Sequence, residues 1–197
     1  MKEAYLKHCD ERKSENLPPL ALDAKQTKSV VESLLEGNDD EFNLPSIDII
    51  NSVVNLFFLT NPHAPSGRLF SQSAIFSIAS QIDALLVVDE AYVEFVEDQS
   101  ILTQLSNYDN LIVVQTFSKA QGLAGVRLGM CFADPDIIHL MNKIKTPYNI
   151  NVLTQEVVLK RLEEQGLIQQ QIQQILAEKD RIINEISTLY FIKKMFH

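Results

Sequence analysis

The residues best suited to chemistry lie at the ends of apolar runs. Lys119 follows the run LIVVQTF with one serine between, and Asp89 ends the run LLVVD. Such runs are typical of strands buried on both faces of a parallel sheet. Ligands of open α/β sheets bind at the carboxyl ends of these strands. Lys119 and Asp89 are therefore expected at one site.

Lys119 is the candidate nucleophile. A lysine at the rim of a buried sheet is partly desolvated, which lowers its pKa and frees the amine to form Schiff bases with aldehydes. A lone lysine is more commonly a surface group, so the neighbouring residues decide its interpretation. Asp89 is a carboxylate that needs a cationic partner, and a protonated pyridine nitrogen would serve. The pair indicates a pyridoxal phosphate site.

The segment LLVVDE has two other interpretations. Asp89 could cap a helix. Apolar residues leading to Asp-Glu are also typical of the Walker B strand, which binds magnesium in P-loop ATPases. That strand requires a partner segment of the form G-x-x-x-x-G-K-[ST], and this sequence has none.

Further polar side chains follow the same runs. Tyr92 could donate a hydrogen bond to a cofactor oxygen, although a packed tyrosine would give the same letters. Thr116 and Ser118 carry hydroxyls, and Arg127 carries a guanidinium that can grip a phosphate. Glycines at positions 122, 125 and 129 would let the backbone approach a ligand, or would serve a loop that needs positive φ.

A sheet must position these residues. The segments between the apolar runs have helical spacing at Ser71–Ala79 and Ile101–Leu105. Strands alternating with helices predict an α/β fold, a mostly parallel sheet flanked by helices. The four predicted strands are VNLFFLT (54–60), ALLVVDE (84–90), LIVVQTF (111–117) and LGMCFAD (128–134).

Both ends of the chain are predicted to be mainly helical. Before the sheet, Asp23 caps a helix that ends at Gly37 and follows the helix-breaking LPPLAL. After the sheet come helices in DPDIIHLMNKIK, in NVLTQEVVLKRLEEQ, closed by Gly166, and in the segment from Leu167. YFIKKMFH resumes a strand pattern. One apolar stripe of the third helix is predicted to contain Ile172, Ile175, Leu176, Ile182 and Ile183.

Composition excludes several classes of protein. The 197 residues carry a net charge of −9, which argues against non-specific nucleic-acid binding. The apolar runs are too short to span a bilayer, and the four histidines lack metal-ligand spacing, so neither a membrane nor a metal partner is predicted. Cys9 and Cys131 suggest no disulfide framework. The sequence therefore predicts a soluble, cytoplasmic protein.

As a set, the motifs resemble those of a known family. D-x-A-Y, a serine-lysine and GLAGxRLG are similar to the fold-type I pyridoxal phosphate aminotransferases. VVDEAYVEF and FSKAQGLAGVRLG most resemble histidinol-phosphate aminotransferases, and NPHAPSGR resembles their Asn-Pro-Thr-Gly loop. The resemblance covers about residues 43–197. It implies a truncated large domain that ends where the small domain begins.

The resemblance also implies roles. Lys119 would hold pyridoxal 5′-phosphate as an internal aldimine and later shuttle the substrate proton. Asp89 would pair with the pyridinium nitrogen, and Tyr92 would bind the ring hydroxyl. The phosphate would be held by Thr116, Ser118 and Arg127.

The sequence departs from the family pattern in three places. Ala64 stands where the family has asparagine, and Ser66 stands for its threonine, so the ring-oxygen contact is expected at Asn61 instead. The family's N-terminal third, with its phosphate turn and ring-stacking aromatic, has no counterpart. The arginine that would bind the substrate carboxylate is also missing.

The function implied is transamination of histidinol phosphate with 2-oxoglutarate or glutamate by a homodimer. The alternatives are a truncated or fused remnant without turnover and a related pyridoxal phosphate decarboxylase. Residues 1–42 resemble instead the N-terminal helical start of bacterial aconitase B, without its ligand residues. Two segments, 1–42 and 43–197, are therefore expected. A truncated sheet is expected to self-associate or to be marginally stable.

Overall fold

The computed structural model describes residues 55–188 of the chain. Contacts divide the chain into a unit of Phe58–Ser80 with Leu85–His197 and a unit of Met1–Phe57 with Gln81–Ala84. All predicted site residues belong to the first of these units. The predicted helix after Asp23, the LPPLAL segment and the YFIKKMFH strand lie outside the described residues.

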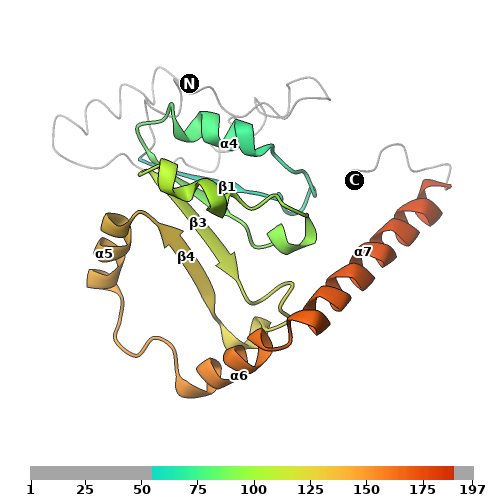
Figure 1. The fold of residues 1–197 in the computed structure, drawn as a ribbon. Coiled ribbons are helices and arrows are strands. Elements are labelled where there is room, and N and C mark those ends of the chain that lie inside the picture. Colours follow the sequence, from blue (N-terminus) through green and yellow to red (C-terminus); the bar gives the residue numbers. More distant parts are fainter. Residues whose placement is uncertain (1–54, 189–197) are drawn as a thin grey trace, which may run out of the picture. The chain divides into compact units, whose positions relative to one another are not determined.

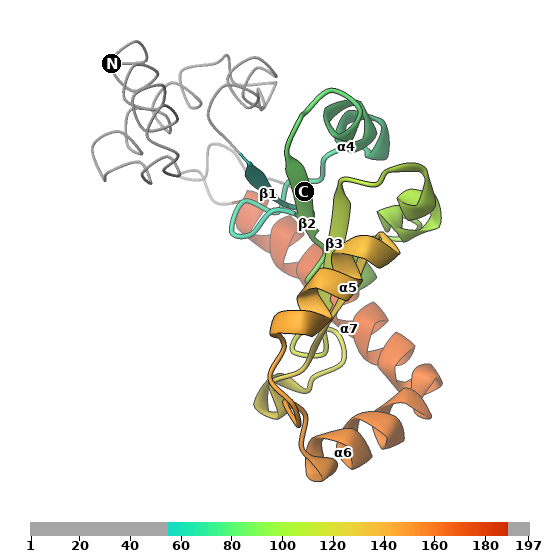
Figure 2. The same ribbon diagram turned by 90° about the vertical axis from the view of Figure 1, so that its left-hand side faces the viewer.

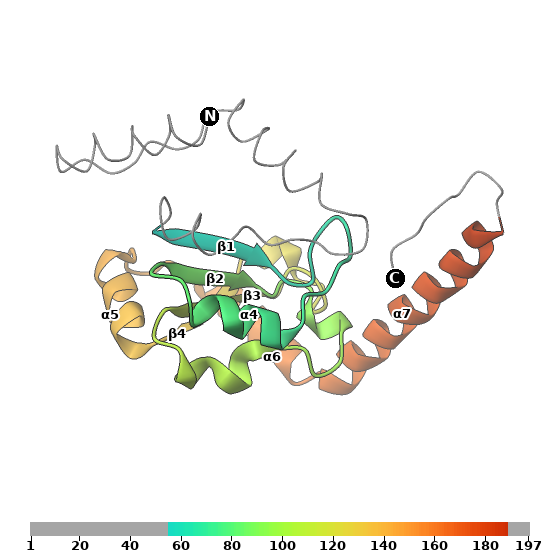
Figure 3. The ribbon, with the colours of Figure 1, turned by 90° about the horizontal axis from the view of Figure 1, so that it is seen from above.

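The centre of the fold is a four-stranded sheet in the order β1-β2-β3-β4. β2 and β3 are parallel, with Asp89 opposite Val114. β1 and β2 run in the same direction (Figure 3), and β4 is antiparallel to β3. This mostly parallel arrangement confirms the predicted α/β fold. The strands are β1 (Leu56–Thr60), β2 (Leu85–Asp89), β3 (Leu111–Thr116) and β4 (Gly129–Ala133).

The two inner strands carry the core. Leu86 of β2 and Leu111 and Val113 of β3 are completely buried. The prediction that all four strands are buried on both faces is wrong for β1 and β4: Phe58 of β1 is 67% exposed, and Cys131 of β4 is exposed. These two strands end the strand order of the described sheet, where fewer elements cover each face.

The connections between the first three strands are helical, as predicted. α4 (Gln72–Ala79) begins after Ser71, whose hydroxyl accepts a hydrogen bond from the backbone N–H of Ala74, and it buries Ile75 and Ile78. Two 3₁₀ segments, η1 (Val93–Phe95) and η2 (Ile101–Asn107), lie between β2 and β3. Figure 3 shows α4 with β1–β4, and Figure 1 labels α4, β1, β3 and β4.

Three α-helices follow β4 (Figure 2): α5 (Pro135–Ile144), α6 (Val152–Leu162) and α7 (Gln165–Ser187). The predicted stop at Gly166 is wrong, because Gly166 lies in the first turn of α7. α6 ends at Leu162, and the amides of the next two residues, Glu163 and Glu164, bond to the carbonyls of Lys160 and Arg161. The carbonyl of Glu164 then accepts the first bonds of α7, so the chain turns before it reaches the glycine.

Only part of the predicted apolar stripe on α7 is buried. Ile168 and Ile172 are buried and pack with Ala120, which belongs to the loop after β3. Ile175 and Ile182 lie on the same helix but are 54% and 44% exposed, so the stripe extends beyond the buried contacts. Residues four apart lie on the same side of a helix. Ile168 and Ile172 on this side pack α7 against the loop that contains Lys119 and Ala120.

Candidate functional site

The predicted site residues meet at one edge of the sheet. β2 and β3 are parallel, so Asp89 and Thr116 lie near the carboxyl ends of adjacent strands. β4 is antiparallel and starts at this same edge, with Gly129 opposite Thr116. The segment that precedes β4, including Arg127, therefore returns to the ends of β2 and β3. The convergence inferred from strand ends is present in the fold.

Lys119 and Tyr92 come together across this edge. The ammonium of Lys119 lies 4.9 Å from the centroid of the Tyr92 ring, a cation–π contact. Lys119 sits in a turn closed by a hydrogen bond from the N–H of Gly122 to its carbonyl (2.9 Å), and the next residue, Ala120, is buried. The side chain of Lys119 itself is exposed. The expected partial desolvation of this lysine is therefore not found.

One carboxylate oxygen of Asp89 is hydrogen-bonded within the described residues and the other is not. Its Oδ1 accepts a hydrogen bond from the N–H of Ala91 (2.9 Å). Its Oδ2 has no hydrogen bond to any of the described residues. The helix-cap interpretation does not hold, because the next element, η1, begins at Val93 after Tyr92, with no side-chain cap. A half-buried carboxylate with one open oxygen suits a cationic N–H donor.

Asn61 fastens the 61–70 loop to the end of β2. Its Oδ1 accepts from the N–H of Phe70 (2.8 Å), its Nδ2 donates to the carbonyl of Phe70 (3.3 Å), and its own N–H donates to the carbonyl of Asp89 (2.9 Å). The side chain is 1% exposed. Ser66 is occupied within the loop, where its hydroxyl lies 2.7 Å from Nδ1 of His63. The other N–H of Nδ2 is the donor that Asn61 could offer to a ring oxygen.

Thr116, Ser118 and Arg127 carry the donor groups predicted for a phosphate, and the hydroxyl of Thr116 donates to the carbonyl of Leu128 (3.5 Å) in this structure. The Oγ1 of Thr116 accepts from the N–H of Ser118 (3.1 Å), which turns the chain after β3. Arg127 is exposed, and one of its Nη atoms donates to the carbonyl of Ala124 (2.9 Å) at the start of η3 (Ala124–Val126). Hydroxyls and a guanidinium are strong donors to phosphate oxygens.

Arg127 also has an unusual backbone conformation. Its φ of +54° and ψ of +46° place it in the left-handed region. A residue with a β-carbon adopts this conformation at a cost, and such strain clusters at functional sites. The conformation supports a functional role for this position.

The structure explains why glycine is needed at two of the three positions, 122 and 129. A β-carbon at Gly129 would lie 2.9 Å from the carbonyl oxygen of Gln115, so a larger residue would push β4 away from β3. Gly122 has a φ of +70°. Gly125 has neither constraint. The sequence pattern alone could not separate these cases.

Sequence reasoning missed several residues that support the site. Glu90 is completely buried, and its carboxylate accepts hydrogen bonds from the Ser100 hydroxyl, the Ile101 N–H and the Gln115 amide, each of 2.8 Å. Arg161 of α6 donates from Nε to the carbonyl of Gln121 (2.9 Å), two residues after Lys119. For Glu90 a local signal existed, because it is a charged residue directly after the apolar run that ends at Asp89. For Arg161 no local signal existed, because its partner is 40 residues away.

Glu94 is a further titratable group beside the site. Burial raises the pKa of the Glu94 carboxyl above its ordinary value, and the nearby Glu90 carboxylate raises it further. Hydrogen bonds from its own backbone and from the Gln121 side chain act in the opposite direction.

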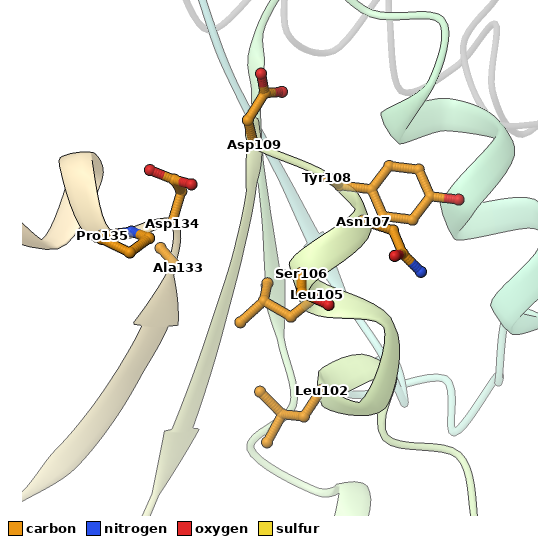
Figure 4. A pocket seen from close by; sticks show the side chains of 9 residues that line it. All are labelled: Leu102, Leu105, Ser106, Asn107, Tyr108, Asp109, Ala133, Asp134 and Pro135. Carbon is orange, nitrogen blue, oxygen red and sulfur yellow. The ribbon is translucent and has the colours of Figure 1, made fainter.

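A pocket of about 730 Å³ lies at the other end of β3 (Figure 4). Its lining comes from η2, the turn before β3 and the end of β4, and it includes Ser106, Asp109 and Asp134. One oxygen of Asp134 caps α5 by accepting from the N–H of Asp136 (2.8 Å). None of the predicted site residues lines this pocket, so we do not assign the chemistry to it.

Within residues 55–188, no helix combines the length and apolar character needed to cross a membrane. The same part of the chain contains no group of three or more His, Cys, Asp or Glu side chains that could hold a metal ion.

Comparisons with known proteins agree with the motif set. The family model "Aminotransferase class I and II" matches residues 22–192. A histidinol-phosphate aminotransferase of Flavobacterium johnsoniae is 37% identical over 150 residues, which cover 76% of this chain and 43% of the relative. That of Parabacteroides distasonis is 42% identical over 147 residues, 73% of this chain and 43% of the relative. The chain thus spans less than half the length of these relatives.

Solved structures of this kind share the fold. The histidinol-phosphate aminotransferase from Sinorhizobium meliloti, in complex with pyridoxal-5′-phosphate, has a TM-score of 0.65 and 26% identity and covers 69% of this chain and 38% of its own. The L-threonine-O-3-phosphate decarboxylase from Porphyromonas gingivalis has a TM-score of 0.62 and 25% identity, and the match covers 69% of this chain and 42% of the decarboxylase. The family match begins inside the 1–42 segment, whose aconitase B-like origin stays a prediction.

Proposed function

The chain belongs to the aminotransferase class I and II family, and from this premise we propose that it binds pyridoxal phosphate through Lys119. The observation that carries the proposal is the position of the Lys119 ammonium, 4.9 Å from the centroid of the Tyr92 ring at the sheet edge where Asp89 ends β2. Together these residues offer an amine, a carboxylate and a phenol to one small ligand.

The remaining donors suit the same cofactor. The open oxygen of Asp89 can accept from a pyridinium N–H. Thr116, Ser118 and Arg127 would donate to the phosphate, and Tyr92 and Asn61 would be the donors to a ring hydroxyl. When bound, pyridoxal phosphate supplies an electron sink. The chain's own contribution is to orient the ring and to move a substrate proton at Nζ of Lys119.

For the reaction, we propose transamination of histidinol phosphate with 2-oxoglutarate or glutamate. The names of the curated relatives support this substrate. A phosphorylated amino compound and a 2-oxo acid would be the small-molecule partners, and a homodimer in the cytoplasm would be the working form. The similarity to the L-threonine-O-3-phosphate decarboxylase keeps decarboxylation as a second candidate.

The remnant hypothesis rests on specific observations. Lys119 is exposed, and Ala64 lacks the amide of the family loop. A catalytic geometry requires all its parts in place. The chain could therefore retain the cofactor contacts without turnover.

The first experiment is reductive labelling of the chain. Purified protein is mixed with pyridoxal phosphate, its visible spectrum is recorded, borohydride is added, and labelled peptides are mapped. We expect label on the Lys119 peptide, no label there in Lys119→Ala, and an unchanged fold in that variant, within about 0.5 kcal/mol, because the side chain is exposed. Lys143→Ala, at another exposed lysine, is the control. Label spread evenly over surface lysines would reject the proposal.

A single-turnover assay then separates the reactions. Spectral conversion of the bound cofactor by histidinol phosphate would support transamination. Release of CO₂ from L-threonine-O-3-phosphate would support decarboxylation instead. Unreduced protein that forms the Lys119 adduct but is inert to both compounds would favour the remnant hypothesis.

A further inference from the structure

Arg161 lies in the last turn of α6, but its side chain is not placed like that of an ordinary helix-end cation. A basic residue there can interact favourably with the helix dipole while its charge stays in water, as the exposed Lys160 can. The side chain of Arg161 is instead only 12% exposed. Burial of a guanidinium is unfavourable unless its N–H groups find acceptors. The acceptors therefore indicate what this residue holds.

The three nitrogens of the Arg161 guanidinium bond to three different segments. Nε donates to the backbone carbonyl of Gln121 (2.9 Å), 40 residues away in the sequence. Nη1 donates to Oε2 of Glu164 (3.1 Å), in the corner between α6 and α7. Nη2 donates to the side-chain oxygen of Gln171 on α7. Because the guanidinium is planar and its donors have fixed directions, these bonds determine where the Gln121 carbonyl lies relative to that corner.

The carbonyl that receives the Nε bond belongs to the turn that carries Lys119. The N–H of Gly122 closes this turn on the Lys119 carbonyl (2.9 Å), so Gln121 lies inside it. A β-carbon placed on Gly122 would lie 3.9 Å from Nη2 of Arg161, so the guanidinium is next to the backbone of the turn. Arg161 is therefore placed to control the backbone two and three residues after the lysine.

The turn has a second attachment, which is apolar. Ala120 belongs to a cluster with residues of α7 and η1. The other members are Ile168, Ile172, Leu176 and Phe95. Apolar contacts hold a segment against its neighbours without a preferred direction, whereas charge-assisted hydrogen bonds have a defined geometry. The cluster thus keeps the turn packed, and the guanidinium sets its orientation.

We propose that Arg161 is a positioning residue for Lys119. By holding the Gln121 carbonyl, its guanidinium orients the turn so that the Lys119 ammonium lies 4.9 Å from the centroid of the Tyr92 ring. Lys119 is exposed, so the position of its ammonium depends on the orientation of its backbone. This positioning exists without the cofactor. Its importance for catalysis rests on the proposed function.

The alternative is that Arg161 only stabilises the junction of α6 and α7. Its loss would then lower the stability of the folded chain without a specific change in the turn. Arg181 of α7 provides a matched control, because its guanidinium bonds Glu178 (2.8 Å) and Glu185 (2.7 Å) of its own helix. Arg161→Ala and Arg181→Ala each remove a guanidinium and its ion pairs, but only Arg161→Ala removes the bond to Gln121.

The position of Lys119 is measured by the proton chemical shift of its ε-methylene group in the full chain without cofactor. Nuclei above an aromatic ring are shifted upfield, and Tyr92→Leu gives the value without the ring. An exposed cation–π contact favours its geometry by only about two- to fivefold, so we expect Arg161→Ala to lose about half of the upfield shift or more. Arg181→Ala should keep the wild-type shift.

The turn itself is measured by amide hydrogen exchange. The Gly122 N–H should exchange roughly tenfold faster in Arg161→Ala, which corresponds to about one lost charge-assisted hydrogen bond. The Glu90 N–H donates to the Val114 carbonyl (2.9 Å) between β2 and β3 and should keep its rate. Arg161→Lys keeps the charge without the planar fork and should show the same changes, so it replaces Arg161→Ala if that variant does not fold.

Two results would overturn the inference. One is a wild-type Lys119 shift and Gly122 exchange rate in a folded Arg161 variant. The other is equal acceleration of the Gly122 and Glu90 amides, which would mean general destabilisation. The predicted changes together with failed pyridoxal phosphate labelling of the wild type would leave the role of Arg161 standing and reject the proposed function. Normal labelling of Lys119 with an unchanged turn in the Arg161 variants would do the reverse.

Discussion

Arg127 combines a strained backbone with a side chain suited to a phosphate. We expect Arg127→Gly to be more stable than Arg127→Ala by about 1 kcal/mol, because only glycine adopts a φ of +54° without strain. Both variants lose the guanidinium, so both should bind pyridoxal phosphate roughly tenfold more weakly or worse. Chemical denaturation and spectral titration measure the two effects. Equal stabilities of the two variants would show that the backbone is not strained.

Glu94 makes a prediction about stability against pH. Its pKa is raised in the folded chain, so the folded state holds this proton at pH values where the unfolded state has lost it. The contribution is fully present below the ordinary value of 4.5 and is lost as pH rises through the folded-state pKa. Urea titrations should show this fall for wild type relative to Glu94→Gln. Parallel curves for the two proteins would contradict it.

At the scale of elements, two buried isoleucines, Ile168 and Ile172, pack α7 against Ala120 in the loop after β3. Ile172 is 4% exposed and packs near Ala120, whereas Ile175 on the same helix is 54% exposed. Ile172→Ala should destabilise the chain by about 2 kcal/mol, and Ile175→Ala by less than about 0.5 kcal/mol. Denaturation midpoints measure both changes. Similar effects of the two substitutions would mean that α7 does not pack as described.

For the whole molecule, the principal feature is exposed apolar surface on α5, α6 and the segment between them. Surfaces of this kind favour association, and a homodimer is expected for the proposed function. The clearest members are Leu140, Ile144, Tyr148, Val152, Leu153 and Leu159, all at least 60% exposed.

We therefore expect the apparent mass in light scattering to rise with protein concentration. Leu153→Glu and Leu159→Glu should shift the chain toward monomer, because a charge resists burial at an interface. Gln174→Glu, on an exposed position of α7, is the charge control. A monodisperse monomer at all concentrations with a high melting temperature would contradict the prediction.

Local patterns were enough for most elements and for the edge of the sheet at which the predicted site residues meet. Strand and helix periods appear directly in the order of apolar residues, which is why α4, α5 and the runs ending at Asp89 and Thr116 could be predicted. Parallel strands then bring their carboxyl ends together. The motif set supplied the family.

The tertiary structure was needed for contacts between residues distant in sequence. The bonds of Asn61 to Phe70 and of Arg161 to Gln121 join segments that no local pattern relates. Burial also depends on which elements cover a residue, so the exposure of Lys119 and the short buried line on α7 could not be inferred from periodicity. The start of α7 before Gly166 depended likewise on backbone bonds of Glu164. A side chain's type sets what chemistry it can do, while its neighbours in space set its protonation and its partners.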